Sequence, residues 1–236
     1  TKDASPNVVG IVRGKNPDAG YVILGAHYDH LPPRRRGEDK IYNGADDNAS
    51  GTAAILAIGK SMVALKDSLE SSVVLIAFTG EEAGLKGSRH FVEQSPIDLK
   101  KVRGLFNLDM ISRGTKNTIF IDGAEGAPTL ITALKKANDS IGLTLRVDEH
   151  PDWLSRSDQW PFIRKGVPAV LFSVEDHEDY HQVTDHADRI MADLARNVAR
   201  LIALATLDLA GAEGVPSPSA EEASAEDASD PTPSTE

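Results

Sequence analysis

Histidine and acidic side chains follow the apolar runs of this sequence, near the point where each run ends. They are His27 and Asp29 after the run 21–26, Glu81 and Glu82 after 72–79, Asp109 after 104–108, and His181 beyond 169–173. Because the carboxyl ends of parallel strands meet at one crevice of an open α/β sheet, we expect these side chains to lie together. The chain has no cysteine, so a metal ion there would be held by imidazole nitrogens and carboxylate oxygens.

A glycine-containing loop with further acids lies between the first two of these runs. It reads Asn-Gly-Ala-Asp-Asp-Asn-Ala-Ser-Gly over residues 43–51 and contains Asp46 and Asp47. A pair of adjacent acids, or one His-x-Asp, is usually a solvated surface feature when it stands alone. Four such signals at the ends of four apolar runs, with this loop between two of them, indicate a metal site.

The apolar runs also predict the elements that position this site. Short apolar runs alternate with amphipathic stretches, which is typical of a mostly parallel sheet with helices on both faces. We therefore predict the α/β fold class and a three-layer α/β/α sandwich. The expected strands span 7–12, 21–26, 72–79, 104–108, 118–121, 144–147 and 169–173, with the most apolar run, 73–78, at the centre of the sheet. Apolar residues at helical spacing predict helices over 51–66, from Pro128 onward, and over 187–209.

Composition bounds the domain organisation. A length of 236 residues with 40% hydrophobic residues suits one large domain with a sizeable core, which we expect over residues 1–210. The remainder, 211–236, is rich in Pro, Ser and Ala and holds seven acids without Lys or Arg. Such a composition cannot bury enough apolar surface to offset the entropy of ordering, so we expect an acidic, disordered tail.

Charge and hydropathy exclude two classes of partner. The 25 basic residues are outnumbered by 36 acidic ones, for a net charge of −11, and a nucleic-acid surface would need an excess of basic residues. No stretch approaches the roughly 20 apolar residues of a membrane-spanning helix. The first residues show no basic-then-apolar pattern of a signal peptide, and we expect them to open a mature or trimmed catalytic segment. We expect neither a nucleic-acid partner nor a membrane span.

Six motifs together resemble a known enzyme family. They are Gly-Ala-His-Tyr-Asp-His over 25–30, the loop 43–51, Phe-Thr-Gly-Glu-Glu over 78–82 with Gly-Leu-Lys-Gly-Ser over 84–88, Asn-Leu-Asp-Met over 107–110, Ser157-Asp158, and Tyr180-His181. In order, spacing and residue type they resemble the binuclear zinc aminopeptidases typified by secreted bacterial leucyl aminopeptidases. That family is related to glutamate carboxypeptidase, glutaminyl cyclase and the transferrin receptor.

The resemblance implies a metal-ligand set and a location. It assigns His27, Asp47, Glu82, Asp109 and His181 as ligands of two zinc ions, with Asp47 bridging them and a non-proline cis peptide bond after Asp47. One ion would take His27 and Asp109, and the other Glu82 and His181. Most members are secreted or periplasmic, which is the location we expect here.

The resemblance also implies roles for three further residues. Glu81 corresponds to the general base that takes a proton from a water shared by the two zinc ions and passes it to the leaving amine. Asp29 corresponds to the carboxylate that accepts the free N–H of the His27 imidazole. Tyr180 could donate its hydroxyl to the oxyanion, or could simply pack beside the metal. The expected substrates are peptides with a free N-terminus.

Other residues have less definite readings. Gln159 departs from the family's commonest residue in a segment near the substrate pocket. Trp153, Trp160 and Phe162 are candidates for walls of that pocket, although loop anchoring would explain them equally well. The remaining histidines match no ligand position and are expected at the surface or behind the ligands: His30, His90, His150, His177 and His186.

Three alternatives remain beside the aminopeptidase. A glutaminyl cyclase keeps one metal's ligands and loses part of the second set, whereas both sets are present here. A carboxypeptidase on the same scaffold would need a basic residue for the terminal carboxylate, for which Arg113 and Arg156 are candidates. An inactive binding module would have lost a ligand or the base, and this chain retains them all.

Overall fold

The computed structural model describes residues 5–211. A seven-stranded sheet runs through this part of the chain in the order β1-β3-β2-β4-β7-β5-β6. Its strands are β1 (Val8–Val12), β2 (Tyr21–His27), β3 (Ser72–Phe78), β4 (Val102–Leu108), β5 (Thr118–Asp122), β6 (Thr144–Val147) and β7 (Ala169–Ser173). The pairs β3/β2, β2/β4, β4/β7 and β5/β6 are parallel, and the pairs β1/β3 and β5/β7 are antiparallel.

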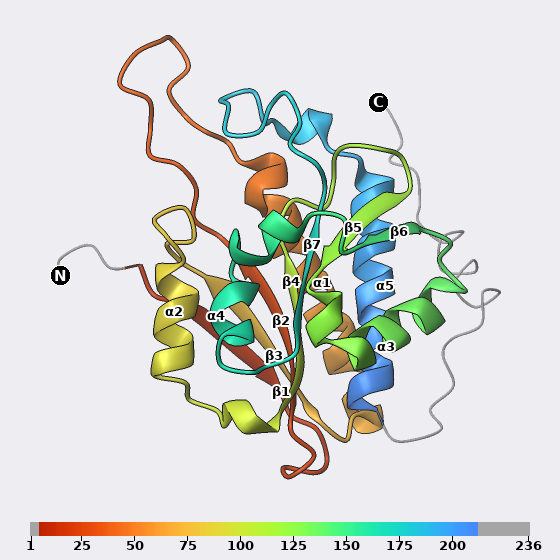
Figure 1. The fold of residues 1–236 in the computed structure, drawn as a ribbon. Helices are drawn as coiled ribbons and strands as arrows, with labels where there is room; N and C mark the ends of the chain where they lie inside the picture. Colours follow the sequence, from red (N-terminus) through yellow and green to blue (C-terminus); the bar gives the residue numbers. More distant parts are fainter. Residues whose placement is uncertain (1–4, 212–236) are drawn as a thin grey trace, which may run out of the picture.

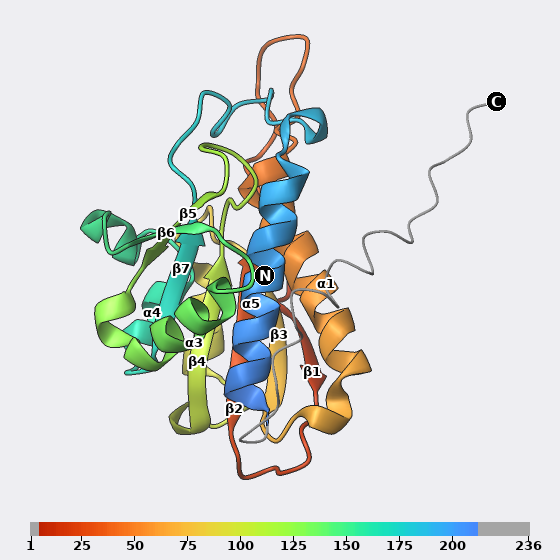
Figure 2. The same ribbon diagram turned by 90° about the vertical axis from the view of Figure 1, so that its right-hand side faces the viewer.

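Helices cover both faces of the sheet, which gives the predicted three-layer α/β fold (Figure 1). One face carries α1 (Gly51–Ala64), α3 (Pro128–Asn138) and α5 (Ala192–Ala210), and the other carries α2 (Lys86–Glu93) and α4 (Gln159–Ile163). Figure 2 shows α5 lying along the first face with α1 and α3 on either side of it. Short helical turns join these elements at Ala45–Ser50, Lys66–Ser68, Leu99–Lys101, Ala124–Gly126, Pro151–Ser155 and Ala187–Arg189.

The core has one part on each side of the sheet. On the first side, α5 presents a stripe at helical spacing that includes Leu194, Val198 and Leu201, all fully or almost fully buried. On the second side, Phe78 packs edge-on against Phe162 of α4 at a ring separation of 5.9 Å. Both faces of the central strands are therefore buried, as their continuous apolar runs predict.

Two sequence predictions are corrected by the structure. The apolar strand β3 is next to the edge strand β1 rather than central, and β4 holds the middle position. The predicted helix over 187–209 is split, because Ile190 has an extended backbone, Met191 is also non-helical, and α5 begins only at Ala192. The Met191 N–H donates to Ser112 O at 2.6 Å, so this break ties the start of α5 to the chain beyond β4. The predicted tail lies outside the described residues except for Gly211.

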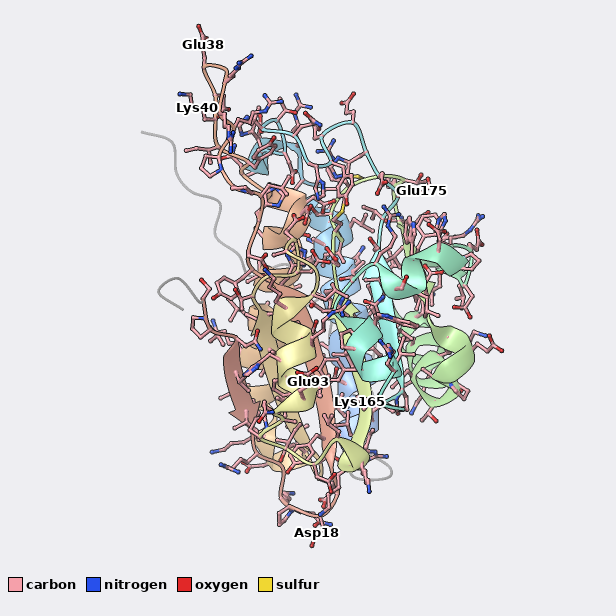
Figure 3. The ribbon with its side chains drawn as sticks, turned by 60° about the vertical axis from the view of Figure 1, so that its left-hand side comes forward. Asp18, Glu38, Lys40, Glu93, Lys165 and Glu175 are labelled. Carbon is pink, nitrogen blue, oxygen red and sulfur yellow. The ribbon has the colours of Figure 1, made fainter. Side chains whose placement is uncertain are left out.

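The carboxyl ends of β2, β3, β4 and β7 lie at the same edge of the sheet. A long loop leaves this edge after β2 and projects from the molecule (Figure 1). Glu38 and Lys40 mark its tip in Figure 3, at the opposite end of the molecule from Asp18. No helix in the described part of the chain is long and apolar enough to cross a membrane.

Neighbouring residues of α1 give a matched test of this packing. Ile55 is 1% exposed against the sheet, whereas Leu56 is 66% exposed. We expect Ile55→Ala to lower the free energy of unfolding by about 2–5 kcal/mol through lost burial and a residual cavity. Leu56→Ala is expected to change it by no more than about 0.5 kcal/mol. Urea denaturation measures both, and equal effects would contradict the placement of α1.

Candidate metal centre

The Asp47 carboxylate lies between two groups of nitrogen and oxygen atoms at the carboxyl edge of the sheet. Its Oδ1 is 3.3 Å from His27 Nε2, and its Oδ2 is 3.2 Å from His181 Nε2. His27 Nε2 is 3.1 Å from Asp109 Oδ1, and His181 Nε2 is 3.3 Å from Glu82 Oε2. The structure thus brings together the five residues that the sequence suggests as metal ligands.

These separations suit metal coordination. Two ligand atoms on one tetrahedral zinc ion, each about 2.0–2.1 Å from the metal, lie about 3.3 Å apart. The four distances around Asp47 are 3.1–3.3 Å. The donors are imidazole nitrogens and carboxylate oxygens, which zinc binds readily. The residues present therefore fit two zinc ions that share Asp47.

Buried hydrogen bonds hold the loop that carries Asp47. The segment Ala45–Ser50 departs from helical backbone at Asp47 and Asn48, and the peptide bond between these two residues is cis, which confirms the expectation. The Asp185 carboxylate accepts the backbone N–H groups of Asp46 and Asp47. The Asn48 side chain bonds to two backbone groups at the end of β4. The position of Asp47 is thereby tied to the sheet.

Asp46 is a second anchor of this loop and is fully buried. Its Oδ1 accepts hydrogen bonds from the N–H and the hydroxyl of Ser112, both at 2.7 Å, and its Oδ2 is 3.2 Å from His177 Nε2. No pattern in the sequence indicates these supporting roles. Asp185 lies 138 residues from Asp47, so no local pattern could have linked the two residues.

Glu81 lines the cavity beside the ligands. In residues 5–211 no side chain donates a hydrogen bond to its carboxylate, so that group is free to act on a bound molecule. Burial, reinforced by the nearby Asp109, raises the pKa of Glu81 to about 9. A carboxyl group with such a pKa can hold a proton near neutral pH.

Asp29 contacts both Glu81 and His27, but not in the expected way. The backbone carbonyl of Asp29 is 3.1 Å from His27 Nδ1, whereas its carboxylate is 3.9 Å from that nitrogen. The carboxylate instead accepts the backbone N–H of Glu81 at 3.1 Å. The imidazole is therefore oriented by the main chain of Asp29, while the side chain of Asp29 fixes the turn that carries Glu81.

Charges at the site are strongly coupled. Burial disfavours the charged form of His27, yet the contacts with Asp109 and Asp47 raise its pKa well above the usual value. Burial also works against ionised Asp47, but hydrogen bonds from His181 and His27 lower the pKa of this carboxyl. A proton on His27 and a metal ion would face the same carboxylates, so metal binding has to displace that proton.

A second layer of polar groups supports Asp109. The Ser157 hydroxyl donates to Asp109 Oδ2 at 2.6 Å, and the Asn107 amide donates to Ser157 Oγ at 3.0 Å. Gln159 accepts from the same amide and donates to two backbone carbonyls of the turn Pro151–Ser155. Gln159, which departs from the family's commonest residue, thus supports the side chains that hold Asp109.

The cavity between the ligands has a volume of about 70 Å³, and both polar and apolar side chains line it. Trp153 is among its lining residues, together with Leu171, Val174, Arg156 and Tyr180. The Tyr180 ring stacks on His181 at a ring separation of 3.9 Å. Burial, together with the charge of Asp47, raises the pKa of the Tyr180 hydroxyl, so the group stays protonated and can donate a hydrogen bond.

His30 matches no ligand position of the resemblance, and of the two expected placements the structure shows the one behind the ligands. Its Nδ1 is 2.8 Å from Glu82 Oε1, and His30, Asp47 and Glu82 form a possible ligand cluster beside the one around His27. By contrast, His150 stacks on Trp153, with 3.9 Å between the ring centres. The position of His30 has no counterpart in the expected ligand set.

Comparisons with known proteins agree with this geometry. The family model described as peptidase family M28 matches residues 7–206. Aminopeptidase YwaD of Bacillus subtilis is 29% identical over 234 residues, covering 92% of this chain and 47% of that protein. The chain thus spans about half the length of this curated relative.

Solved structures show the same fold. BSAP, a zinc aminopeptidase from Bacillus subtilis, superposes with a TM-score of 0.73 at 26% identity, covering 89% of this chain and 51% of that chain. A glutaminyl cyclase from an Acidobacteriales bacterium has a TM-score of 0.66 at 23% identity, covering 86% and 73% of the two chains. The likeness to the cyclase extends to the fold alone.

The burial of Asp158 near the site can be tested by the pH dependence of stability. It is fully buried, accepts a hydrogen bond from Ser88 at Oδ1 and has no partner at Oδ2. Burial raises its pKa from 3.8 to about 7. Between these values the folded protein holds a proton that the unfolded chain has released, so stability falls as pH rises, by about 1.4 kcal/mol per pH unit.

In the metal-free protein, Asp158→Asn should therefore flatten the decline in the free energy of unfolding between pH 5 and pH 7 by about 2–3 kcal/mol. Urea titrations across this range measure the slope. Asp152→Asn is the control, since the Asp152 side chain is 75% exposed and its removal should leave the slope unchanged. Parallel curves for wild type and Asp158→Asn would refute the burial argument.

Proposed function

This chain belongs to peptidase family M28, and on that premise we propose that it is a zinc-dependent aminopeptidase acting on peptides with a free N-terminus. One observation carries the proposal. The two oxygens of Asp47 face two separate nitrogen donors, His27 Nε2 at 3.3 Å and His181 Nε2 at 3.2 Å. A carboxylate in that position is suited to bridging two metal ions.

The ligand assignment follows from the same contacts. His27 and Asp109 would hold one zinc ion, and Glu82 and His181 the other, with Asp47 shared. When bound, the two ions supply Lewis-acid chemistry: they polarise the scissile carbonyl and make water acidic enough to lose a proton near neutral pH. The similar protein BSAP is described as a zinc aminopeptidase, which supports zinc as the metal.

Glu81 is the proposed general base. It lines the cavity, its carboxylate has no competing donor among residues 5–211, and its backbone is fixed by Asp29. It would take a proton from water during attack and deliver that proton to the leaving amine. Bound cations lower the pKa of a neighbouring carboxyl, so the high metal-free value for Glu81 should fall into the range useful for this exchange.

Tyr180 is the proposed donor to the oxygen on which negative charge develops. Its hydroxyl stays protonated because burial raises the pKa of this group, and its ring is held against His181. A preorganised donor in a water-poor cavity stabilises a developing oxyanion.

The basic residues near the cavity already face acids, which argues against a carboxylate as the recognised end of the substrate. Arg113 donates to Asp179 at 2.8 Å and is thus already paired. Arg156 lines the cavity between Asp152 and Asp176, at 3.9 Å and 3.7 Å, which offsets its charge. The described lining residues therefore offer the terminal carboxylate of a carboxypeptidase substrate no positive charge that an acid does not already offset, which disfavours a carboxypeptidase.

The proposal predicts the response to a blocked amine. Zinc-loaded protein should hydrolyse leucyl-p-nitroanilide and leave the N-acetylated compound intact, as release of p-nitroaniline will measure. Glu81→Gln should keep both metal ions and lose at least about 100-fold in kcat, because it cannot accept the proton. Equal cleavage of the blocked compound would contradict aminopeptidase action. Cyclisation of glutaminyl peptides without hydrolysis would favour the cyclase.

Metal removal should also destabilise the fold. Without cations, Asp47, Glu82 and Asp109 crowd like charges into one crevice. Metal at 1,000 times its Kd contributes about 4 kcal/mol, which corresponds to roughly 10 °C in Tm for a domain of this size. Scanning calorimetry with and without a chelator measures the shift. Asp47→Asn is expected to show little difference between the two conditions, and an unchanged wild-type Tm after complete metal removal would contradict the proposal.

A further inference from the structure

His30 occupies a confined position behind Glu82. Its side chain is 12% exposed, and its ring meets Tyr42 and His181 edge-on, each with 6.0 Å between ring centres. On a further side the backbone of Gly44 approaches so closely that a Cβ there would lie 2.8 Å from His30 Cδ2. The ring is therefore fixed by packing on several sides, just where the loop that carries Asp47 begins.

The distances distinguish His30 from the metal ligands. Nitrogen and oxygen atoms that would share a metal ion lie 3.1–3.3 Å apart around Asp47. His30 Nδ1 is 2.8 Å from Glu82 Oε1 and 3.8 Å from Asp47 Oδ2. The first distance is typical of an N–H donor on a carboxylate, and the second is longer than the separation of two ligands on one zinc ion. His30 therefore fits a hydrogen-bond donor better than an additional ligand.

The two oxygens of Glu82 consequently face different partners. Oε1 accepts from His30, while Oε2 is 3.3 Å from His181 Nε2. His30 Nε2 is buried and has no hydrogen-bond partner in the described structure. The contact with Glu82 is therefore the hydrogen bond that the imidazole makes there. A carboxylate held at one oxygen can no longer rotate freely about its terminal bond.

We propose that His30 is a positioning residue for the second metal ion. Its Nδ1–H occupies Oε1 of Glu82 and thereby turns Oε2 toward Asp47 and His181. This inference rests on the two-metal function proposed above. Hydrogen-bond partners behind metal ligands typically contribute a factor of about 10–100 to metal affinity. Loss of the donor should therefore weaken the second ion selectively, because neither His27 nor Asp109 contacts His30.

Stepwise metal binding tests this role without any activity assay. His30→Phe keeps a ring and removes the donor, whereas His30→Asn places an amide N–H close to the position of Nδ1. His90→Phe is the matched control, since His90 is an exposed histidine on α2. Zinc affinity for each equivalent is measured by competition with a chromophoric chelator, and the absorption spectrum of the Co²⁺ form reports the geometry of each site.

We expect wild type, His30→Asn and His90→Phe to bind two equivalents with similar affinities. His30→Phe should bind the first equivalent normally and the second about 10–100-fold more weakly, with the Co²⁺ spectrum altered only for the second. An unchanged second affinity in His30→Phe would overturn the proposal. So would equal weakening of both equivalents, or a loss in His30→Asn as large as in His30→Phe.

The peptidase function and the role of His30 can be refuted separately. A wild-type protein that binds two ions with this dependence on His30, yet cleaves no substrate with a free amine, would refute the peptidase and leave the role of His30 standing. Two-metal binding with amine-dependent cleavage, but no effect of His30→Phe on the second ion, would do the reverse. A wild-type protein that binds fewer than two ions would overturn both.

Discussion

The Asp47 carboxylate faces two groups of nitrogen and oxygen atoms at once, and the surrounding structure holds it in that position. Its loop leaves helical geometry at Asp47 and Asn48, which frees backbone groups that would cost about 1–3 kcal/mol each if buried without partners. Asp185 accepts two of the freed N–H groups, and the Asn48 amide joins the loop to the end of β4. The sheet positions two further side chains of the site, because His27 ends β2 and the neighbouring strand β4 leads directly into Asp109.

The same position of Asp47 explains the charge arrangement. In the proposed site a bridging carboxylate needs other metal ligands beside it, and acids do converge here in a crevice that is largely removed from water. Protons then reside on carboxyl groups that are usually ionised and on an imidazole that is usually neutral. Burial raises the pKa of Glu81 and of Asp158, and neighbouring carboxylates raise the pKa of His27. Two divalent cations would offset the same negative charge. Metal binding, proton release and stability are therefore coupled in this site.

Different parts of the structure could be predicted from the sequence for different reasons. The strands, and the meeting of acids and histidines at one edge of the sheet, follow from apolar runs that end in such residues, since topology brings the carboxyl ends of neighbouring strands together. The choice of five ligands among them rests on the family resemblance. The position of β3 in the strand order cannot be predicted from its apolar residues, because hydrophobicity indicates that both faces of a strand are buried and not how far the strand lies from the edge of the sheet. The break before α5 depends on the bond from Met191 to Ser112, and the role of His30 depends on its 2.8 Å contact with Glu82. These partners are distant in sequence, so no local pattern indicates them.

The central claim is that Asp47 lies between two metal ions, and anomalous diffraction tests it most directly. Crystals of the zinc-loaded protein, measured on both sides of the zinc absorption edge, would locate each ion without reference to any assumed ligand set. We predict two peaks that flank the Asp47 carboxylate, one beside His27 and Asp109 and the other beside Glu82 and His181. A single peak, or a second peak away from Asp47, would contradict it.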